Sequence, residues 1–147
     1  MPFDAKLVLA DSTADWTYAN LVSYGTPTSL TRNAGGFVVL DLRKTGAKGL
    51  AAILIIDQTA EATNDALTCT IEASSLLAFT AGYVQQLVTF DIAGATAGII
   101  VGSETPCTVI RRFSTNLQYL RCKASATSAD DFHTCHVLIA PAPFNYL

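Results

Sequence analysis

The segment that decides the fold runs from Cys107 to Ala140 and reads CTVIRRFSTNLQYLRCKASATSADDFHTCHVLIA. It divides into three short strand-like runs separated by polar residues that favour turns. In the middle run, Leu117–Ser125, the residues of two faces alternate, with Leu120, Cys122 and Ala124 on one and Tyr119, Arg121 and Lys123 on the other. A period of two is typical of a strand with one face in a core and one in water. The segment therefore predicts three strands of an all-β domain.

The rest of the chain repeats this rhythm. Leu50–Asp57 (LAAILIID) is almost entirely apolar, which indicates a strand covered on both faces. Apolar and polar residues alternate along Ala66–Ser74 and again along Gln86–Ile92. Further short strands are predicted at Lys6–Ala10, Asn20–Tyr24, Phe37–Leu42, Leu76–Thr80 and Ile99–Val101. Many short strands without a convincing helical period predict a sandwich, jelly roll or barrel.

The length and composition fit one domain. At 147 residues the chain is expected to form a single antiparallel β-sandwich of about eight strands, spanning residues 1–147. Residues 1–35 hold the first strand and a long connection rich in Ser, Thr, Asn, Gly and Pro, and residues 141–147 are a Pro-rich tail. The N-terminal sequence lacks the basic leader and long apolar segment of a secretory signal. The four cysteines are accordingly expected to be reduced, buried thiols.

The surface is expected to be poor in charge. Charged residues make up 14% of the chain, against about a quarter in an average soluble domain, and 50% of residues are hydrophobic. This balance fits a compact domain with a mildly polar surface. It favours a domain whose surface is partly buried against copies of itself or against a larger partner. The net charge of −3 argues against a general nucleic-acid binder. No apolar run is long enough for a membrane-spanning helix.

No motif in the chain predicts catalysis, a metal site or a cofactor. The cluster His133–His136 (HTCH) is the nearest approach to a metal site, but on a strand His133 and Cys135 share one face while His136 points to the other. Neither a nucleophile elbow nor a phosphate-binding glycine loop is present. The expectation is a protein that is not an enzyme, with a buried Cys135 beside surface histidines.

Aromatic residues in the irregular segments are the first candidate contacts. Trp16 and Tyr18 lie in the N-terminal connection, and Phe144 and Tyr146 lie in the tail. Such residues either dock on the sheets of their own domain or contact a partner, because aromatic side chains are enriched at the cores of interfaces. Both alternatives remain open at this level.

The chain as a whole resembles the jelly-roll capsid cement (decoration) proteins of short-tailed bacteriophages. The resemblance is carried by FDAKLVLAD (Phe3–Asp11), GGFVVLDL (Gly35–Leu42), AAILIIDQT (Ala51–Thr59), FSTNLQYLRCKASAT (Phe113–Thr127) and HTCHVLIAP (His133–Pro141). It implies a homotrimer of jelly rolls that sits between capsomers, binds the major capsid protein and stabilises the phage head. Such a protein is assembled in the bacterial cytoplasm and ends on the outer surface of the virion. The alternatives are a head-fibre or tail component and a glycan- or receptor-binding β-sandwich.

A basic patch is the second candidate contact. The largest basic group in the chain is formed by Arg111, Arg112, Arg121 and Lys123. If the strands that carry these residues are neighbours, their side chains form one patch on an otherwise acidic domain. The patch is then expected to contact the capsid or another subunit, together with the aromatic candidates.

Overall fold

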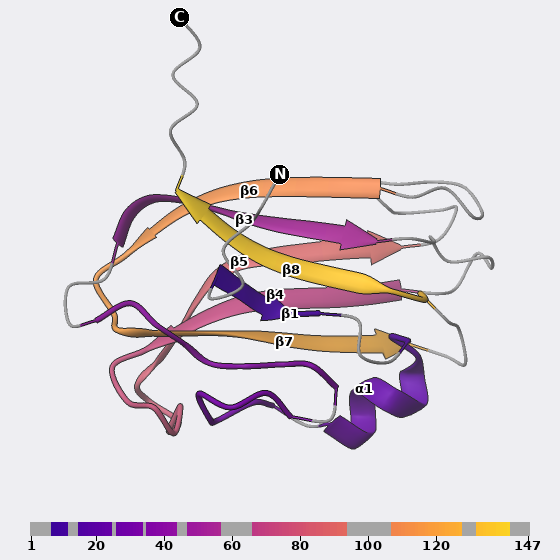
Figure 1. The fold of residues 1–147 in the computed structure, drawn as a ribbon, viewed down its shortest axis with the longest axis horizontal. Helices are drawn as coiled ribbons and strands as arrows, with labels where there is room; N and C mark the ends of the chain where they lie inside the picture. Colours follow the sequence, from indigo (N-terminus) through magenta and orange to yellow (C-terminus); the bar gives the residue numbers. More distant parts are fainter. Residues whose placement is uncertain are drawn as a thin grey trace, which may run out of the picture.

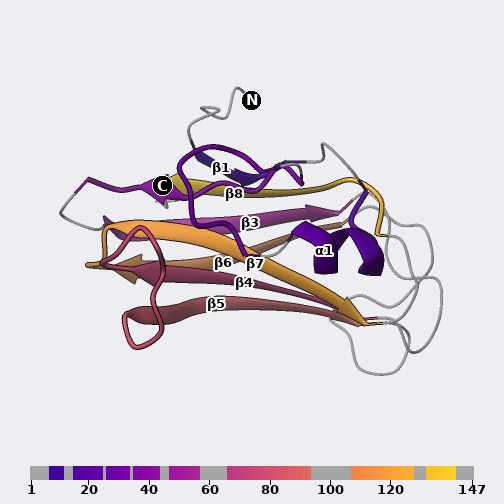
Figure 2. The ribbon, with the colours of Figure 1, turned by 90° about the horizontal axis from the view of Figure 1, so that it is seen from below.

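Two antiparallel β-sheets packed face to face make up the fold, as Figures 1 and 2 show from two directions. The computed structural model describes residues 7–11, 15–24, 26–33, 35–43, 47–56, 66–93, 107–127 and 132–141. These residues contain eight strands, four in each sheet, and one short helix. The prediction of an all-β antiparallel sandwich of about eight strands is confirmed.

The strands pair in a nested order. The first sheet contains, in spatial order, β1 (Val8–Ala10), β8 (Cys135–Pro141), β3 (Ala47–Ile56) and β6 (Cys107–Thr115). The second sheet contains β2 (Leu40–Asp41), β7 (Tyr119–Thr127), β4 (Ala66–Ser74) and β5 (Val84–Ala93). Thus β1 pairs with β8, β2 with β7, β3 with β6 and β4 with β5. In addition, β3 pairs with β8 and β4 pairs with β7, which joins these four strand pairs into two sheets.

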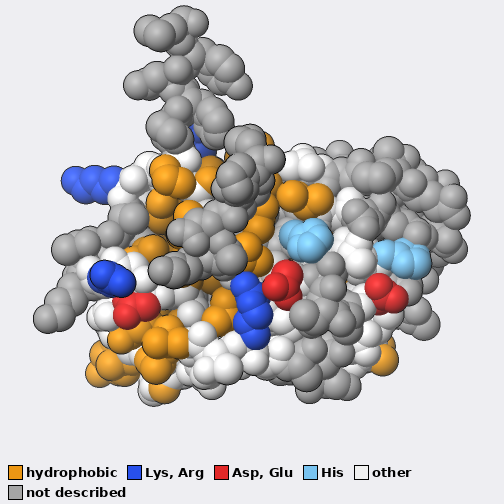
Figure 3. All heavy atoms as spheres, in the orientation of Figure 1, with side chains coloured by type: hydrophobic (Ala, Val, Ile, Leu, Met, Phe, Trp, Pro, Cys, Tyr) orange, Lys and Arg blue, Asp and Glu red, His pale blue; other side chains and the backbone are white. Residues whose placement is uncertain are grey.

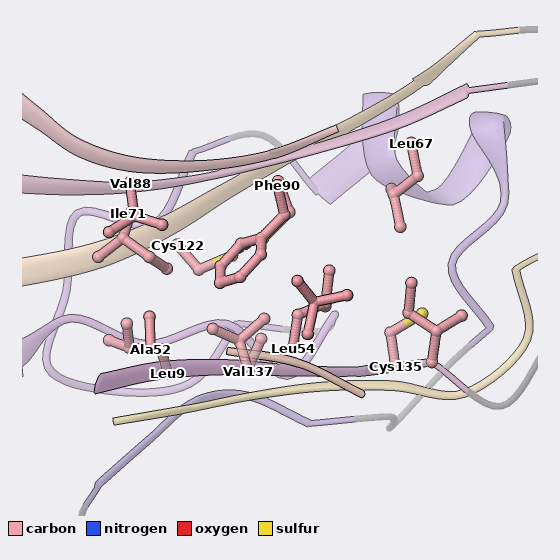
Figure 4. Close-up of a cluster of buried hydrophobic side chains, with 14 of the residues drawn as sticks. Leu9, Ala52, Leu54, Leu67, Ile71, Val88, Phe90, Cys122, Cys135 and Val137 are labelled. Carbon is pink, nitrogen blue, oxygen red and sulfur yellow. Dashed lines mark hydrogen bonds between the residues drawn. The ribbon is translucent and has the colours of Figure 1, made fainter. Parts of the chain in front are cut away.

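The core lies between the sheets and is built from alternate residues of their strands (Figure 4). Leu54 of β3 and Phe90 of β5 approach each other from opposite sheets, and both are completely buried. Full burial of a side chain of this size stabilises the fold by roughly 1.5–3 kcal/mol. Ala51 and Ile53 point to the other face of β3 and are also buried, at 1% and 7% exposure. The prediction that this strand is covered on both faces is therefore confirmed.

The N-terminal connection closes the side of the sandwich where β1 and β2 lie. Phe37 forms an isolated bridge with Ala10 at the edge of the first sheet, and Leu40 pairs with Leu120 in the second. The chain thus crosses from one sheet to the other between these two contacts. The predicted strand Phe37–Leu42 is accordingly reduced to the two residues of β2, because the residues before it make the crossing.

The prediction of a strand at Asn20–Tyr24 is wrong. These residues belong to the helix α1 (Tyr18–Tyr24), which lies beside β7. Thr17 caps the helix, since its Oγ1 accepts a hydrogen bond from the backbone N–H of Asn20 at 3.1 Å. The helix buries Leu21, which is 5% exposed, in the core. Burial of one face and the cap together outweigh the strand preference of these residues.

The prediction of a strand at Leu76–Thr80 is also wrong. These residues form part of the turn between β4 and β5. The predicted strand Ile99–Val101 lies outside the described residues, as does the tail after Pro141. The three strands predicted from Cys107–Ala140 are confirmed as β6, β7 and β8.

Candidate docking surface

The turn between β4 and β5, residues 75–83, presents apolar side chains to solvent and is called the tip below. Its exposed large side chains are Leu76 at 41%, Leu77 at 37% and Tyr83 at 57%. In Figure 3 hydrophobic side chains gather at the lower left, where Figure 1 places this turn. From Ser74 to Gln86 the sequence holds no charged residue. An exposed apolar cluster of this kind is typical of a surface that contacts another molecule.

Hydrogen bonds within the tip fix its backbone. The N–H of Leu76 donates to the Oγ of Ser74 at 3.0 Å. The N–H of Phe79 donates to the carbonyl of Leu76, and the N–H of Tyr83 donates to the carbonyl of Thr80, each at 3.0 Å. The tip is therefore a succession of closed turns with a defined shape.

Phe79 is the one large residue of the tip that turns inward, with 6% exposure. Its backbone has a φ of 48°, a left-handed conformation that costs a residue with a side chain about 1–2 kcal/mol. The guanidinium of Arg121 stacks on the Phe79 ring, with its Cζ 4.2 Å from the ring centre. This cation–π contact offsets the cost of the backbone conformation and fastens the tip to the outer face of the second sheet.

A largely buried ion pair holds Arg121 in place. Glu72 and Arg121 are direct partners in the register of β4 and β7. The Oε2 of Glu72 accepts from the Nε of Arg121 at 2.7 Å and lies 2.6 Å from its Nη2. The two side chains are only 14% and 10% exposed. The arginine is thus oriented by two charge-assisted contacts, so that its flat face is available to Phe79.

A hollow lined by polar residue types lies at the same end of the sandwich as the tip. It has a volume of about 260 Å³ and is lined by Lys48, Ser114, Thr115 and Asn116, beside the turn from β6 to β7. Figures 1 and 2 both place that turn and the tip at one end of the molecule. The Oγ of Ser114 already accepts from the N–H of Gly49 at 3.0 Å, so its own proton is directed elsewhere. The hollow therefore places polar side chains at the same end of the sandwich as the apolar tip.

Trp16, a predicted interface residue, belongs to the core. Its side chain is 1% exposed and stacks on Phe37, with the ring centres 5.2 Å apart and the planes at 23°. The backbone N–H of Trp16 donates to the carbonyl of His133, and its carbonyl accepts from the N–H of Phe132. Trp16 therefore fastens the N-terminal connection to the domain itself, and the expectation of a partner contact is corrected for this residue.

The basic residues do not form the single patch that the sequence suggested. Arg111 and Arg112 lie on β6 in the first sheet, whereas Arg121 and Lys123 lie on β7 in the second. Arg121 is 9% exposed and is committed to Glu72 and Phe79. The patch is thus corrected, because the two strands are not neighbours. Arg111, Arg112 and Lys123 are exposed, as is Tyr18 on α1, while Phe144 and Tyr146 lie outside the described residues.

Three cysteines, Cys69, Cys122 and Cys135, lie in the core as thiols that form no disulfide. The Sγ atoms of Cys69 and Cys122 are 3.2 Å apart, and both residues are completely buried. Burial raises the pKa of the Cys122 thiol well above its usual value, and the contact with Cys69 adds to the effect. Such a thiol stays protonated and unreactive at neutral pH. Cys135 is buried as well and donates to the carbonyl of Phe132 at 3.5 Å. In the described ranges no three His, Cys, Asp or Glu side chains gather as a metal site would require.

The tip was missed because its residues have the composition of a strand. Leu76, Leu77 and Phe79 suggest an apolar run, but they do not alternate with polar residues. The serines before the run and Gly82 after it were the available signal for a turn. The contact between Phe79 and Arg121 joins residues far apart in the chain, and no local pattern predicts it.

Comparisons with family models, with curated proteins and with solved structures found no match to this chain. No helix in the part of the chain that the structure describes is long and apolar enough to cross a membrane. Function is therefore inferred from the geometry of the described residues. The strongest feature among them is the fixed apolar tip with its ion-pair anchor.

Proposed function

We propose that this chain is a virion structural protein, a cement protein that binds the outer surface of a phage head between capsomers. In this proposal it acts as a homotrimer and contacts the major capsid protein through the tip. The single observation that carries the proposal is the tip itself, because Leu76, Leu77 and Tyr83 are exposed on a backbone that is already fixed. A fixed contact surface loses little conformational freedom on binding, which leaves more of the contact energy as affinity.

The strand order supports the same proposal. Nested pairing of β1 with β8, β2 with β7, β3 with β6 and β4 with β5 is what an antiparallel ribbon rolled into two sheets produces. We infer a jelly-roll topology from this order. Jelly rolls with eight strands are a common architecture of viral capsid proteins, of lectins and of cupins. Repetition of the tip over a symmetric shell would add avidity to a modest single contact.

The test is binding to shells assembled from the major capsid protein that the same genome encodes. The double variant Leu76→Ser with Leu77→Ser is compared with Leu30→Ser, whose leucine is 51% exposed and lies outside the tip. We expect the double variant to bind at least about tenfold more weakly in co-sedimentation, since it removes two apolar side chains from the contact. Leu30→Ser should bind as the unchanged protein does. Sedimentation equilibrium measures the molecular mass of the assembly for all three proteins, and we expect the mass of a trimer in each case.

Two results would contradict the proposal in different ways. If the double variant binds shells as well as the unchanged protein does, the tip is not the contact. If the unchanged protein neither binds the shells nor forms trimers, the cement function itself is wrong.

A glycan- or receptor-binding module is the second candidate. Tyr83 favours it, because a 57% exposed aromatic ring on a fixed turn offers an apolar face with a polar edge. Binding on a glycan array that is lost in Tyr83→Ala, together with no binding to shells, would favour this candidate over the cement protein.

A further inference from the structure

The two sides of the sandwich end in edges of different length. On one side the edge strands β1 and β2 have 3 and 2 residues, and on the other β6 and β5 have 9 and 10. In Figure 1 β6 forms the upper border of its sheet. At roughly 3.3 Å per residue it offers an edge about 30 Å long. Long edges of this kind are templates for pairing with another chain.

The backbone of β6 is regular enough to accept a further strand. Its pairing with β3 runs without a shift from Cys107 opposite Ile56 to Phe113 opposite Leu50. β6 contains no proline and pairs with no other strand in the described ranges. Every second residue therefore directs its N–H and C=O away from β3. Bulges and prolines, which blunt many natural edges, are absent from this paired stretch.

Two arginines flank this edge on opposite faces. Arg111 and Arg112 are consecutive, so their side chains leave the strand on different sides. Arg111 lies on the same face of β6 as Val109 and Phe113, which point inward and are 7% and 9% exposed. Arg111 itself is exposed. Neither arginine forms a salt bridge with an acidic residue of the described ranges. A strand added to β6 would thus meet positive charge on both of its faces.

We propose that the edge of β6 that pairs with no described strand binds an extended acidic segment of another protein by strand addition. Two neighbouring carboxylates of that segment, one on each face, pair with Arg111 and Arg112. This site is separate from the tip and stands independently of the cement function. Backbone hydrogen bonds supply the affinity of such complexes, and side chains on the two faces supply the specificity.

A second copy of this chain is a poor partner for the same edge. Arg111 is the midpoint of β6, so antiparallel pairing of two copies about that midpoint sets Arg111 of one copy directly opposite Arg111 of the other, while Arg112 lies opposite Ile110. Like charges at directly opposed positions destabilise a strand pair. The charge of the edge thus selects an acidic segment over self-association.

The test uses the whole chain and a fluorescent peptide, Thr-Val-Thr-Asp-Asp-Val-Thr-Val, in an anisotropy titration. We expect Arg111→Glu and Arg112→Glu each to weaken binding roughly tenfold, the scale of one charge-assisted contact. Lys123→Glu is the matched control, since it makes the same change of charge at an exposed residue on β7, and it should bind as the unchanged protein does. Amide hydrogen exchange should slow in β6 when the peptide is bound.

Three further probes decide whether strand addition is the mode of binding. A peptide with Lys-Lys in place of Asp-Asp should not bind. A peptide with prolines in place of its third and sixth residues, which flank the Asp-Asp pair, keeps the charges but loses a backbone donor on each side of the strand, and it should bind at least about tenfold more weakly. Equal binding of the proline peptide would overturn the proposal, as would binding of a single-stranded oligonucleotide without binding of the acidic peptide. Concentration-dependent dimers that disappear in Arg111→Glu would overturn it as well, because they would assign the edge to self-association.

Discussion

The N-terminal connection (residues 15–43) and the tip both lie outside the long strands and both carry aromatic residues, but they use them in opposite ways. The connection turns its largest ring inward, where Trp16 stacks on Phe37. The tip buries only Phe79 and directs Leu76 and Tyr83 into solvent. The difference lies in the anchor, which is apolar stacking within the core for the connection and an ion pair on the outer sheet face for the tip. An aromatic residue in an irregular segment therefore indicates an interface only once its own packing is known.

The largest expected effect comes from breaking the anchor of the connection. Trp16→Ala should lower the free energy of unfolding by about 3–5 kcal/mol, because it empties a fully buried site. Trp16→Phe should cost about 2 kcal/mol or less, because the indole Nε1 has no hydrogen-bond acceptor among the described residues. Urea denaturation measures both. A loss below about 1 kcal/mol in Trp16→Ala would mean that the connection does not close the sandwich.

Breaking the anchor of the tip should have the next largest effect. Arg121→Ala leaves the Glu72 carboxylate largely buried without its partner, which we expect to cost about 3 kcal/mol. The double variant Arg121→Met with Glu72→Gln should recover most of this loss, because no uncompensated charge remains. Lys123→Ala on the same strand should change stability by no more than about 0.5 kcal/mol. If Arg121→Ala and Lys123→Ala unfold at the same denaturant concentration, the ion pair is not the anchor.

A smaller, pH-dependent effect is expected from Cys122, a core residue of β7. This strand contacts both regions, because it pairs with β2 at the end of the connection and carries Arg121, which anchors the tip. Burial raises the pKa of Cys122 well above 9.0, so the unfolded chain loses this proton at a lower pH than the folded chain does. The protonated Cys122 thiol therefore makes its full contribution to the free energy of unfolding below about pH 9. Above that pH the contribution declines, by up to about 1.4 kcal/mol per pH unit. Denaturation at about pH 8 and about pH 10 should show a steeper loss in the unchanged protein than in Cys122→Ala. Equal losses would assign the effect to other groups.

The smallest expected effect separates the shape of the tip from its anchor. Gly82 has a φ of 91°, and a Cβ at this position would meet no atom within 4 Å. Gly82→Ala should therefore cost only the backbone strain, about 1 kcal/mol. The neighbouring Ala81→Gly should change stability by a few tenths of a kcal/mol. A Gly82→Ala variant as stable as the unchanged protein would show that the tip adapts its backbone freely.

The strands that alternate were predictable, because a period of two is a local signal. Leu67, Cys69 and Ile71 of β4 are all buried as their spacing predicts. The same signal failed for Arg121, which the alternation placed in water and which Phe79 covers. Burial on an outer sheet face depends on what folds back over it, and the sequence near Arg121 does not specify that.

The errors about α1 and about the basic patch have different causes. Helix α1 has only 7 residues, too few to show a helical period, so the strand preference of its apolar residues dominated the prediction. Thr17, a residue type that favours helix N-caps, is the local sign of a helix start in this segment. The prediction of one basic patch is wrong because it requires β6 and β7, which are successive in the chain, to lie side by side. In this fold the chain changes sheets between them.

The nested pairing also sets the order in which the molecule can assemble. Val8 of β1 lies opposite Leu138 of β8, so the first strand has no partner strand until almost the whole described chain has been synthesised. The hairpin of β4 and β5 at the centre of the ribbon needs only a short loop and can form first. Folding would then spread outward from that hairpin, and the tip would take shape before the sheets are complete. A chain that depends so heavily on distant pairings is expected to fold slowly.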